Sequence, residues 1–386
     1  MSAPSPDSRP RSHQAASTDA AVPAAAPFAR WIVFGAGALG SLFGARVSSQ
    51  LPVLLVARPA HAQAVADQGL EIVATAADAL RTSTHIQNDR LTAAVQLPPL
   101  RAGDAVGVFC KTGGTSAAAA AICAAIRAGA TSPTALQAPP AVGPSAPPPG
   151  VGPSAPPPGV GPIQVWTFQN GLDNAAILRR AFADLPAAQQ PEVHVAIAIC
   201  GATLEAPGRV ADYGGYFALP DTPAGHGLGR LLSAAGLAAE FRADIPAELW
   251  RKLALNCVVN PLTILLRRRN RFILAPELAA LRAAVIAEVA AVARAEGVEL
   301  EPAALLAHME TAMAPSWNFS SMYQDRLRHE RRLADWEAAG RPGDRPRLKT
   351  EIEALNGAVV EGARRAGLTA PANRALLELV RFLEAV

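Results

Sequence analysis

Short apolar runs alternate with Ala-rich, amphipathic segments from residue 30 to about residue 200. The apolar runs predict strands at 30–34, 53–57, 105–110, 164–168 and 193–200. The segments between them predict helices at 41–49, 115–128 and 172–184. Strands that alternate with helices are typical of a parallel sheet covered on both faces. The pattern therefore predicts the α/β fold class for this part of the chain.

The spacing of apolar residues becomes helical from about Pro246 onward, with few strand signals. Residues 326–348 are dense in Arg, Asp and Glu and contain two prolines, so we expect a charged insertion between helices. We therefore predict an α/β domain over 29–245 and an all-helical domain over 246–386. The predicted helical segments are 247–266, 276–297, 301–314 and 349–384.

Two segments lack any periodic pattern. Residues 1–28 are rich in Ala, Ser and Pro and have no signal-peptide apolar region, which predicts a disordered tail on a cytoplasmic protein. Between 131 and 162, the sequence Val-Gly-Pro-Ser-Ala-Pro-Pro-Pro-Gly occurs twice in tandem. Proline at this density favours extended, solvated backbone. We interpret this segment as a tolerated, disordered insertion rather than a docking peptide or a domain boundary.

Composition narrows the classes of function. The 386 residues are half hydrophobic and 17% charged, with a net charge of +3, so nothing favours nucleic-acid binding. The basic run 267–269 fits a solvated helix end better than an anion site. The histidines show no metal-ligand spacing, and no apolar run has membrane-spanning length. Four cysteines in apolar contexts predict reduced core residues: Cys110, Cys123, Cys200 and Cys257.

A glycine motif follows the first predicted strand and begins the first helix: Gly35-Ala36-Gly37-Ala38-Leu39-Gly40. Gly35 allows a tight turn, Gly37 lets the backbone approach a pyrophosphate, and Gly40 permits close packing of helix on strand. The helix N-terminus then faces the negative charge. The motif predicts dinucleotide binding, and a purely structural glycine turn is the alternative.

The end of the second strand discriminates between cofactors. NAD-binding proteins tend to place Asp or Glu about 20 residues past the glycine motif. Here the strand ends at Arg58, with His61 nearby and no acidic residue. An arginine suits a 2′-phosphate, so NADPH is the expected cofactor, and a surface arginine is the alternative. Two further loops follow strands and could face the cofactor, although each could be an ordinary polar turn: Lys111-Thr112 and Gln169-Asn170-Gly171.

Three polar side chains lie at four-residue steps in an apolar stretch of the helical half: Lys252, Asn256 and Asn260. On an α-helix these residues share one face, about 6 Å apart per step. Pro261 cannot donate to the carbonyl of Cys257, so we expect a kink there and a free acceptor beside the amides. The face is either a solvated helix surface or a site for an oxygen-rich substrate.

These motifs together resemble the ketopantoate reductases (2-dehydropantoate 2-reductases), from residue 30 to the end of the chain. The glycine motif, Lys111-Thr112 and Gln169-Asn170-Gly171 match the first three motifs of that family. The segment 250–263 matches its most diagnostic motif, and 320–325 and 350–357 resemble its two C-terminal motifs. Four features depart from the family. The segment between Asp325 and Thr350 is longer, Arg271 follows Asn270 where Asn-Gly is common, and the proline-rich insertion and the N-terminal tail are extra.

The resemblance implies a Rossmann-type NADP-binding domain joined to a helical domain, with the active site between them. It makes Lys252 the catalytic residue. It implies substrate contacts at Asn170, Asn256, Asn260, Asn270 and Ser321, and cofactor contacts at Lys111, Asn170 and Glu351 in addition to the glycine motif and Arg58. No metal is implied.

The chemistry of these residues agrees with the resemblance. Hydride transfer to the carbonyl carbon of a 2-oxo acid leaves negative charge on oxygen, which the Lys252 ammonium can stabilise and protonate. The leading hypothesis is NADPH-dependent reduction of 2-dehydropantoate to pantoate, in pantothenate and coenzyme A biosynthesis. The alternatives are a reductase of another branched 2-oxo acid and a non-catalytic NADPH-binding regulator. The apolar helical half is compatible with a homodimer and equally with a buried core.

Overall fold

The computed structural model describes residues 28–75, 82–131 and 161–386. The predicted tail over 1–28 and the proline-rich insertion over 131–162 lie almost wholly outside these ranges. Phe28, placed in the tail by the prediction, belongs to the fold instead. Its buried ring packs edge-on against Trp31, with 5.0 Å between the ring centroids.

Six parallel strands form the first sheet, in the order β5-β2-β1-β6-β7-β8. Numbered along the chain, this is the order 3-2-1-4-5-6 of dinucleotide-binding sheets, and the direction of winding reverses between β1 and β6. Ligands bind such sheets at that point, beyond the carboxyl ends of the strands. The strands are β1 (Arg30–Phe34), β2 (Val53–Val56), β5 (Leu91–Ala94), β6 (Asp104–Val108), β7 (Gln164–Thr167) and β8 (Glu192–Val195).

Helices cover both faces of this sheet, as the alternation of strands and helices predicted. One face packs on α3 (Thr115–Thr131) and α4 (Asn174–Phe182), where Ile122 and Leu178 are fully buried. The other face packs on α1 (Ala38–Val47), whose Phe43 is fully buried. The short helix α2 (Pro59–Gln68) follows β2.

A second sheet of five strands lies on the other side of α1, and the hydrophobic pattern did not predict it. Its central strand β10 pairs antiparallel with β9 and parallel with both β3 and β11. The predicted strand at 193–200 is in fact split at the buried Ala196, where the chain passes from one sheet to the other. The strands are β3 (Leu70–Ala74), β4 (Thr82–Ile86), β9 (Ile197–Ala206), β10 (Arg209–Pro220) and β11 (Ala238–Arg242), with α5 (Pro223–Ala234) after β10.

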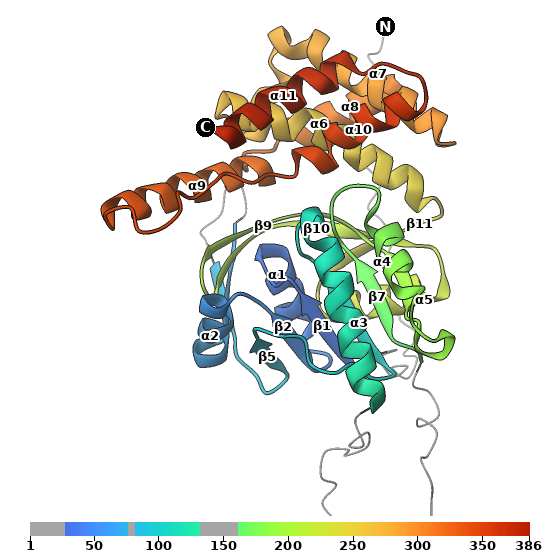
Figure 1. Ribbon diagram of the computed structural model, residues 1–386, viewed down its shortest axis with the longest axis vertical. Helices are drawn as coiled ribbons and strands as arrows, with labels where there is room; N and C mark the ends of the chain where they lie inside the picture. Colours follow the sequence, from blue (N-terminus) through green and yellow to red (C-terminus); the bar gives the residue numbers. More distant parts are fainter. Residues whose placement is uncertain (1–27, 76–81, 132–160) are drawn as a thin grey trace, which may run out of the picture.

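From Ile245 onward every element is helical, and one apolar core joins the helices. Figure 1 shows this helical region stacked on the α/β region, with α9 between them and projecting to one side. The helices are α6 (Ile245–Leu266), α7 (Ala279–Ala295), α8 (Pro302–Met313), α9 (Ser321–Ala338), α10 (Asn356–Arg365) and α11 (Pro371–Ala385). Short 3₁₀ turns are η1 (Thr112–Gly114), η2 (Ala187–Gln189), η3 (Asn270–Leu274), η4 (Pro276–Leu278) and η5 (Ile352–Ala354).

The charged segment 326–348 differs from its prediction. Its first part, up to Ala338, continues helix α9 instead of forming a separate insertion. Ion pairs at helical spacing support this continuation, because Arg326 pairs with Glu330 and Arg328 pairs with Asp325. None of the helices in the described ranges is both long enough and apolar enough to cross a membrane.

Candidate functional site

The glycine turn after β1 has the geometry that its spacing predicted. Gly35 has φ +84°, and a Cβ there would lie 2.7 Å from the backbone nitrogen of Cys110. A Cβ at Gly40 would lie 2.8 Å from Cγ1 of Val33, so α1 packs closely on β1. A Cβ at Gly37 would meet nothing nearer than the Gly35 oxygen, at 4.0 Å, so this position faces open space. Gly37 also leaves the N-terminus of α1 without a side-chain cap, as pyrophosphate binding at a helix N-terminus requires.

We expect Gly35→Ala and Gly37→Ala to separate folding from cofactor binding. Alanine at Gly35 should lower the free energy of unfolding by about 1–3 kcal/mol, because its positive φ and the contact with Cys110 both disfavour a side chain. Gly37 has φ −85°, which alanine tolerates, so Gly37→Ala should unfold like the parent protein. Its methyl group should nonetheless weaken binding of a nicotinamide dinucleotide, because it occupies the space open to the pyrophosphate. Thermal unfolding and NADPH titration check both expectations, and equal loss of stability in the two variants would contradict them.

The end of β2 presents an exposed arginine, which agrees equally with a 2′-phosphate contact and with the alternative of a surface arginine. Arg58 is the N-cap residue of α2, and within the described residues its side chain has no hydrogen bond or ion pair. His61 has a structural role instead. Its Nδ1 accepts from the backbone N–H of Gly208 at 3.0 Å, so its Nε2 carries the proton and donates to Oγ of Ser41 at 2.8 Å. Burial lowers the pKa of His61, which keeps the ring neutral and committed to these two contacts.

The loops after β6 and β7 meet each other at the switch point of the sheet. Oγ1 of Thr112 donates to the carbonyl oxygen of Asn170 at 2.5 Å, and Nδ2 of Asn174 donates to the same oxygen at 2.7 Å. Gln169 is buried, and its Nε2 donates to Oγ1 of Thr115 at 2.8 Å. The two predicted cofactor-side loops are therefore one connected unit.

Glu351, from the helical region, contacts both of these loops. Its Oε1 accepts from the backbone N–H of Thr112 at 3.0 Å, and its Oε2 accepts from Nδ2 of Asn170 at 3.1 Å. Hydrogen bonds to an ionised carboxylate are stronger than those between neutral groups. One carboxylate thus fixes both loops relative to the segment between α9 and α10.

Lys252 lies on α6 at the same boundary between the two regions. Its Nζ donates to the carbonyl oxygen of Ala198, on β9, at 2.8 Å. Burial lowers the pKa of Lys252, and the negative charge of Glu351 opposes that shift. Cys200 also lies nearby, but burial raises its pKa to about 12, so it is an uncharged thiol at neutral pH. One ammonium hydrogen is used by Ala198, which leaves two for other acceptors.

The two amides on the helical face of Lys252 remain free. Neither Asn256 nor Asn260 makes a side-chain hydrogen bond within the described part of the chain. Asn260 is only 4% exposed, and its neighbours Val258 and Val259 are buried. A solvated surface helix, which is the alternative for this face, would leave the Asn260 side chain exposed to water. The face instead carries unused donors and acceptors on a largely buried helix.

The carbonyl freed by Pro261 is not an open acceptor, contrary to the prediction. The Cys257 oxygen accepts from Nδ2 of Asn356 at 3.0 Å, and α6 continues beyond the proline. Asn356 belongs to the motif at 350–357. The missing N–H at Pro261 indicates a carbonyl without its usual donor, but no sequence pattern identifies Asn356 as the replacement.

Three further predicted site residues have other partners or none. The Lys111 ammonium pairs with the buried carboxylate of Asp325 on α9. Nδ2 of Asn270 lies 3.2 Å from both Oγ of Ser316 and Oδ1 of Asn318, so it holds the loop before α9. Ser321 is exposed at the start of α9, where its buried neighbour Ser320 supplies the cap. The structure therefore joins Asn170 and Glu351 directly and brings neither Asn270 nor Ser321 into contact with them.

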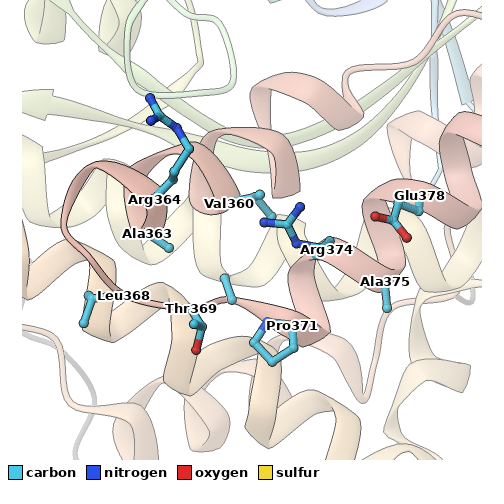
Figure 2. A pocket seen from close by; sticks show the side chains of 10 residues that line it. Val360, Ala363, Arg364, Leu368, Thr369, Pro371, Arg374, Ala375 and Glu378 are labelled. Atoms are coloured by element: carbon cyan, nitrogen blue, oxygen red, sulfur yellow. The ribbon is translucent and has the colours of Figure 1, made fainter.

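Cavities in the described residues also lie away from this boundary. Figure 2 shows one of about 400 Å³ between α10 and α11, with Arg364, Arg374 and Glu378 at its rim. Another, of about 590 Å³, lies beside β8 and the start of α5. Neither contains any predicted site residue, so the candidate site is the boundary between the regions rather than either cavity.

Comparisons with known families match both regions. The model described as "Ketopantoate reductase PanE/ApbA" matches residues 31–132, and "Ketopantoate reductase PanE/ApbA C terminal" matches residues 244–333 and 345–384. The 2-dehydropantoate 2-reductase of Vibrio cholerae is 34% identical over 145 residues, covering 37% of this chain and 43% of that protein. The enzyme of that name from Streptococcus pyogenes serotype M3 is 28% identical over 227 residues, covering 56% and 66%. The chain thus spans less than two thirds of the length of these curated relatives.

Solved structures share the fold over nearly the whole chain. A PanE/ApbA family ketopantoate reductase from Ralstonia eutropha JMP134 has a TM-score of 0.68 at 26% identity, covering 92% of this chain and 98% of that one. D-mandelate dehydrogenase with NADH and anilino(oxo)acetate also has a TM-score of 0.68, at 21% identity and the same coverage. At 21% identity, the similarity to D-mandelate dehydrogenase shows only a shared fold.

Proposed function

Because this chain belongs to the ketopantoate reductase family, we propose that it reduces 2-dehydropantoate to pantoate with NADPH, as a step toward pantothenate and coenzyme A. The observation that supports this proposal most is the meeting of Lys252, Asn170 and Glu351 at one boundary. The proposed proton donor, beside a free helical face of amides, then lies at the boundary where the loops after β6 and β7 meet the helical region.

The residues fit a nicotinamide dinucleotide. The open space at Gly37 and the uncapped N-terminus of α1 accommodate the pyrophosphate, and Arg58 suits a 2′-phosphate. When bound, the cofactor supplies the hydride. The chain itself contributes orientation through the connected loops at Thr112 and Asn170.

Lys252 supplies the proton in this proposal. Hydride addition to the carbonyl carbon moves the π electrons of the C=O bond onto oxygen, and a proton from Nζ of Lys252 converts this alkoxide into the alcohol. The positive charge also stabilises the alkoxide as it forms. Asn256 and Asn260 can hold the carboxylate and hydroxyl of the substrate through neutral donors. The products are the 2-hydroxy acid and the oxidised cofactor.

The preference for NADPH should depend on Arg58. Arg58→Ala should raise KM for NADPH about tenfold or more, because a charge-assisted contact to the 2′-phosphate is lost. KM for NADH, which lacks that phosphate, should change less than about twofold by the same logic. Arg180→Ala is the matched control, since Arg180 is exposed on α4. Equal increases in KM for both cofactors would contradict a contact between Arg58 and the 2′-phosphate.

A panel of 2-oxo acids tests the substrate. The proposal expects the highest kcat/KM with 2-dehydropantoate. A clearly higher kcat/KM with another branched 2-oxo acid would support the same reaction but identify that acid as the substrate. Tight NADPH binding without oxidation by any member of the panel would instead favour a regulator.

A further inference from the structure

Helix α6 contains a break in its backbone ladder at Pro261. Proline has no N–H, so the carbonyl of Cys257, four residues earlier, cannot accept its usual hydrogen bond. The helix nevertheless runs without interruption from Ile245 to Leu266. The affected carbonyl belongs to the residue directly after Asn256 and lies one turn before Pro261.

Asn356 replaces the missing donor. It is fully buried as the first residue of α10, and its Nδ2 donates to the Cys257 oxygen at 3.0 Å. The same Nδ2 donates to Oδ1 of Asn373 at 2.9 Å. Nδ2 of Asn373 donates to the Glu288 carboxylate at 2.8 Å, which fixes the orientation of that amide. Because both groups facing Asn356 are acceptors, its amide nitrogen must point toward them.

The Asn356 amide satisfies two buried acceptors at the cost of one unsatisfied atom. Its Nδ2 serves the Cys257 oxygen and Oδ1 of Asn373, whereas its own Oδ1 is buried without a hydrogen-bond partner in the described part of the chain. An apolar residue would leave both acceptors without a donor. The polar chain from Glu288 through Asn373 to Asn356 therefore fixes one orientation of the amide, with its nitrogen toward α6.

The location of Asn356 links α6 to the cofactor-side loops. It lies five residues after Glu351, with only the short turn η5 (Ile352–Ala354) between them. One end of this segment thus contacts the cofactor-side loops, at Thr112 and Asn170, and the other end contacts α6. A shift of α6 relative to this segment would move Lys252 relative to the same loops.

We propose that Asn356 is a positioning residue, which restores the hydrogen bond lost at Pro261 and sets the Lys252–Asn256–Asn260 face against the segment that carries Glu351. This inference rests on the proposed function for its effect on turnover. Asn356 is a buried core residue, and no contact between Asn356 and the substrate is proposed.

A double-mutant cycle tests the inference. Asn356→Leu keeps the branched shape of the side chain but leaves the Cys257 oxygen without a donor, so kcat should fall about tenfold while Kd for NADPH changes less than about twofold. In Pro261→Ala/Asn356→Leu the new backbone N–H can reach that oxygen, so kcat should return to within about threefold of the Pro261→Ala control. A double variant as slow as Asn356→Leu, or an unaffected single variant, would overturn the proposal. Should Asn356→Leu be insoluble, Asn356→Ser tests the same rescue.

Hydrogen exchange separates this inference from the proposed activity. Backbone amides in peptides covering 253–266 should exchange faster in Asn356→Leu and regain protection in the double variant, whether or not the protein reduces a 2-oxo acid. Unchanged exchange in Asn356→Leu would overturn the positioning role. Rescue of exchange, together with an inactive parent protein, would support the role in the fold and contradict the proposed function alone.

Discussion

Lys252→Ala should lower kcat for 2-oxo acid reduction by about 10²–10⁴-fold, the usual contribution of a positioned proton donor. The loss arises because Lys252 is the ammonium at the boundary between β9 and α6, and no other protonated amine is assigned to the nascent alkoxide. NADPH binding should survive, since the glycine turn and Arg58 lie on the other region. Turnover of the variant and its Kd for NADPH measure the two effects separately.

Lys349→Ala is the matched control for this variant, because Lys349 is an exposed lysine of the helical region. It should retain the turnover of the parent protein. Normal turnover in Lys252→Ala would show that the proton comes from another group. Loss of NADPH binding in Lys252→Ala would show instead that the substitution damages the fold or the cofactor site.

Glu351→Gln should reduce kcat/KM about 10²-fold, because a small displacement of the loops at Thr112 and Asn170 misaligns the reacting groups. It should also change the pH profile. Lys252 must be protonated to act, so the rate falls as pH rises through its pKa. Burial already lowers that pKa and the Glu351 charge opposes the shift, so removing the charge should move the alkaline fall in rate to lower pH.

The control for this prediction is Glu353→Gln. Glu353 lies two residues away, is exposed, and pairs with Arg381. Its replacement should leave both kcat/KM and the alkaline limb unchanged. An alkaline limb at the same pH in Glu351→Gln and the parent protein would contradict the coupling between Glu351 and Lys252.

The first sheet was predictable because its signals are local. Strand β1 and the glycine turn coincide with their predicted residues, since an apolar run, a turn and a helix start follow one another directly. The second sheet was not predictable in this way. Strand β4 is mostly exposed and has no apolar period, and β10 is interrupted by Gly214 and Gly215, which both have positive φ.

The candidate site shows the same contrast. The shared face of Lys252, Asn256 and Asn260 follows from helical spacing alone. The contact between Asn170 and Glu351 joins residues 181 positions apart, which no local pattern can give. Only the resemblance to the family indicated Glu351. The partner of the Cys257 carbonyl, and the pairing of Lys111 with Asp325, depend on how the two regions pack.

The most direct test of the proposal is oxidation of NADPH by the purified protein on addition of 2-dehydropantoate, with pantoate measured in the same reaction. We expect substrate-dependent oxidation, one pantoate formed for each NADPH consumed, and loss of both in Lys252→Ala but not in Lys349→Ala. The contrary result would be NADPH that binds yet stays reduced with 2-dehydropantoate and with every other 2-oxo acid supplied.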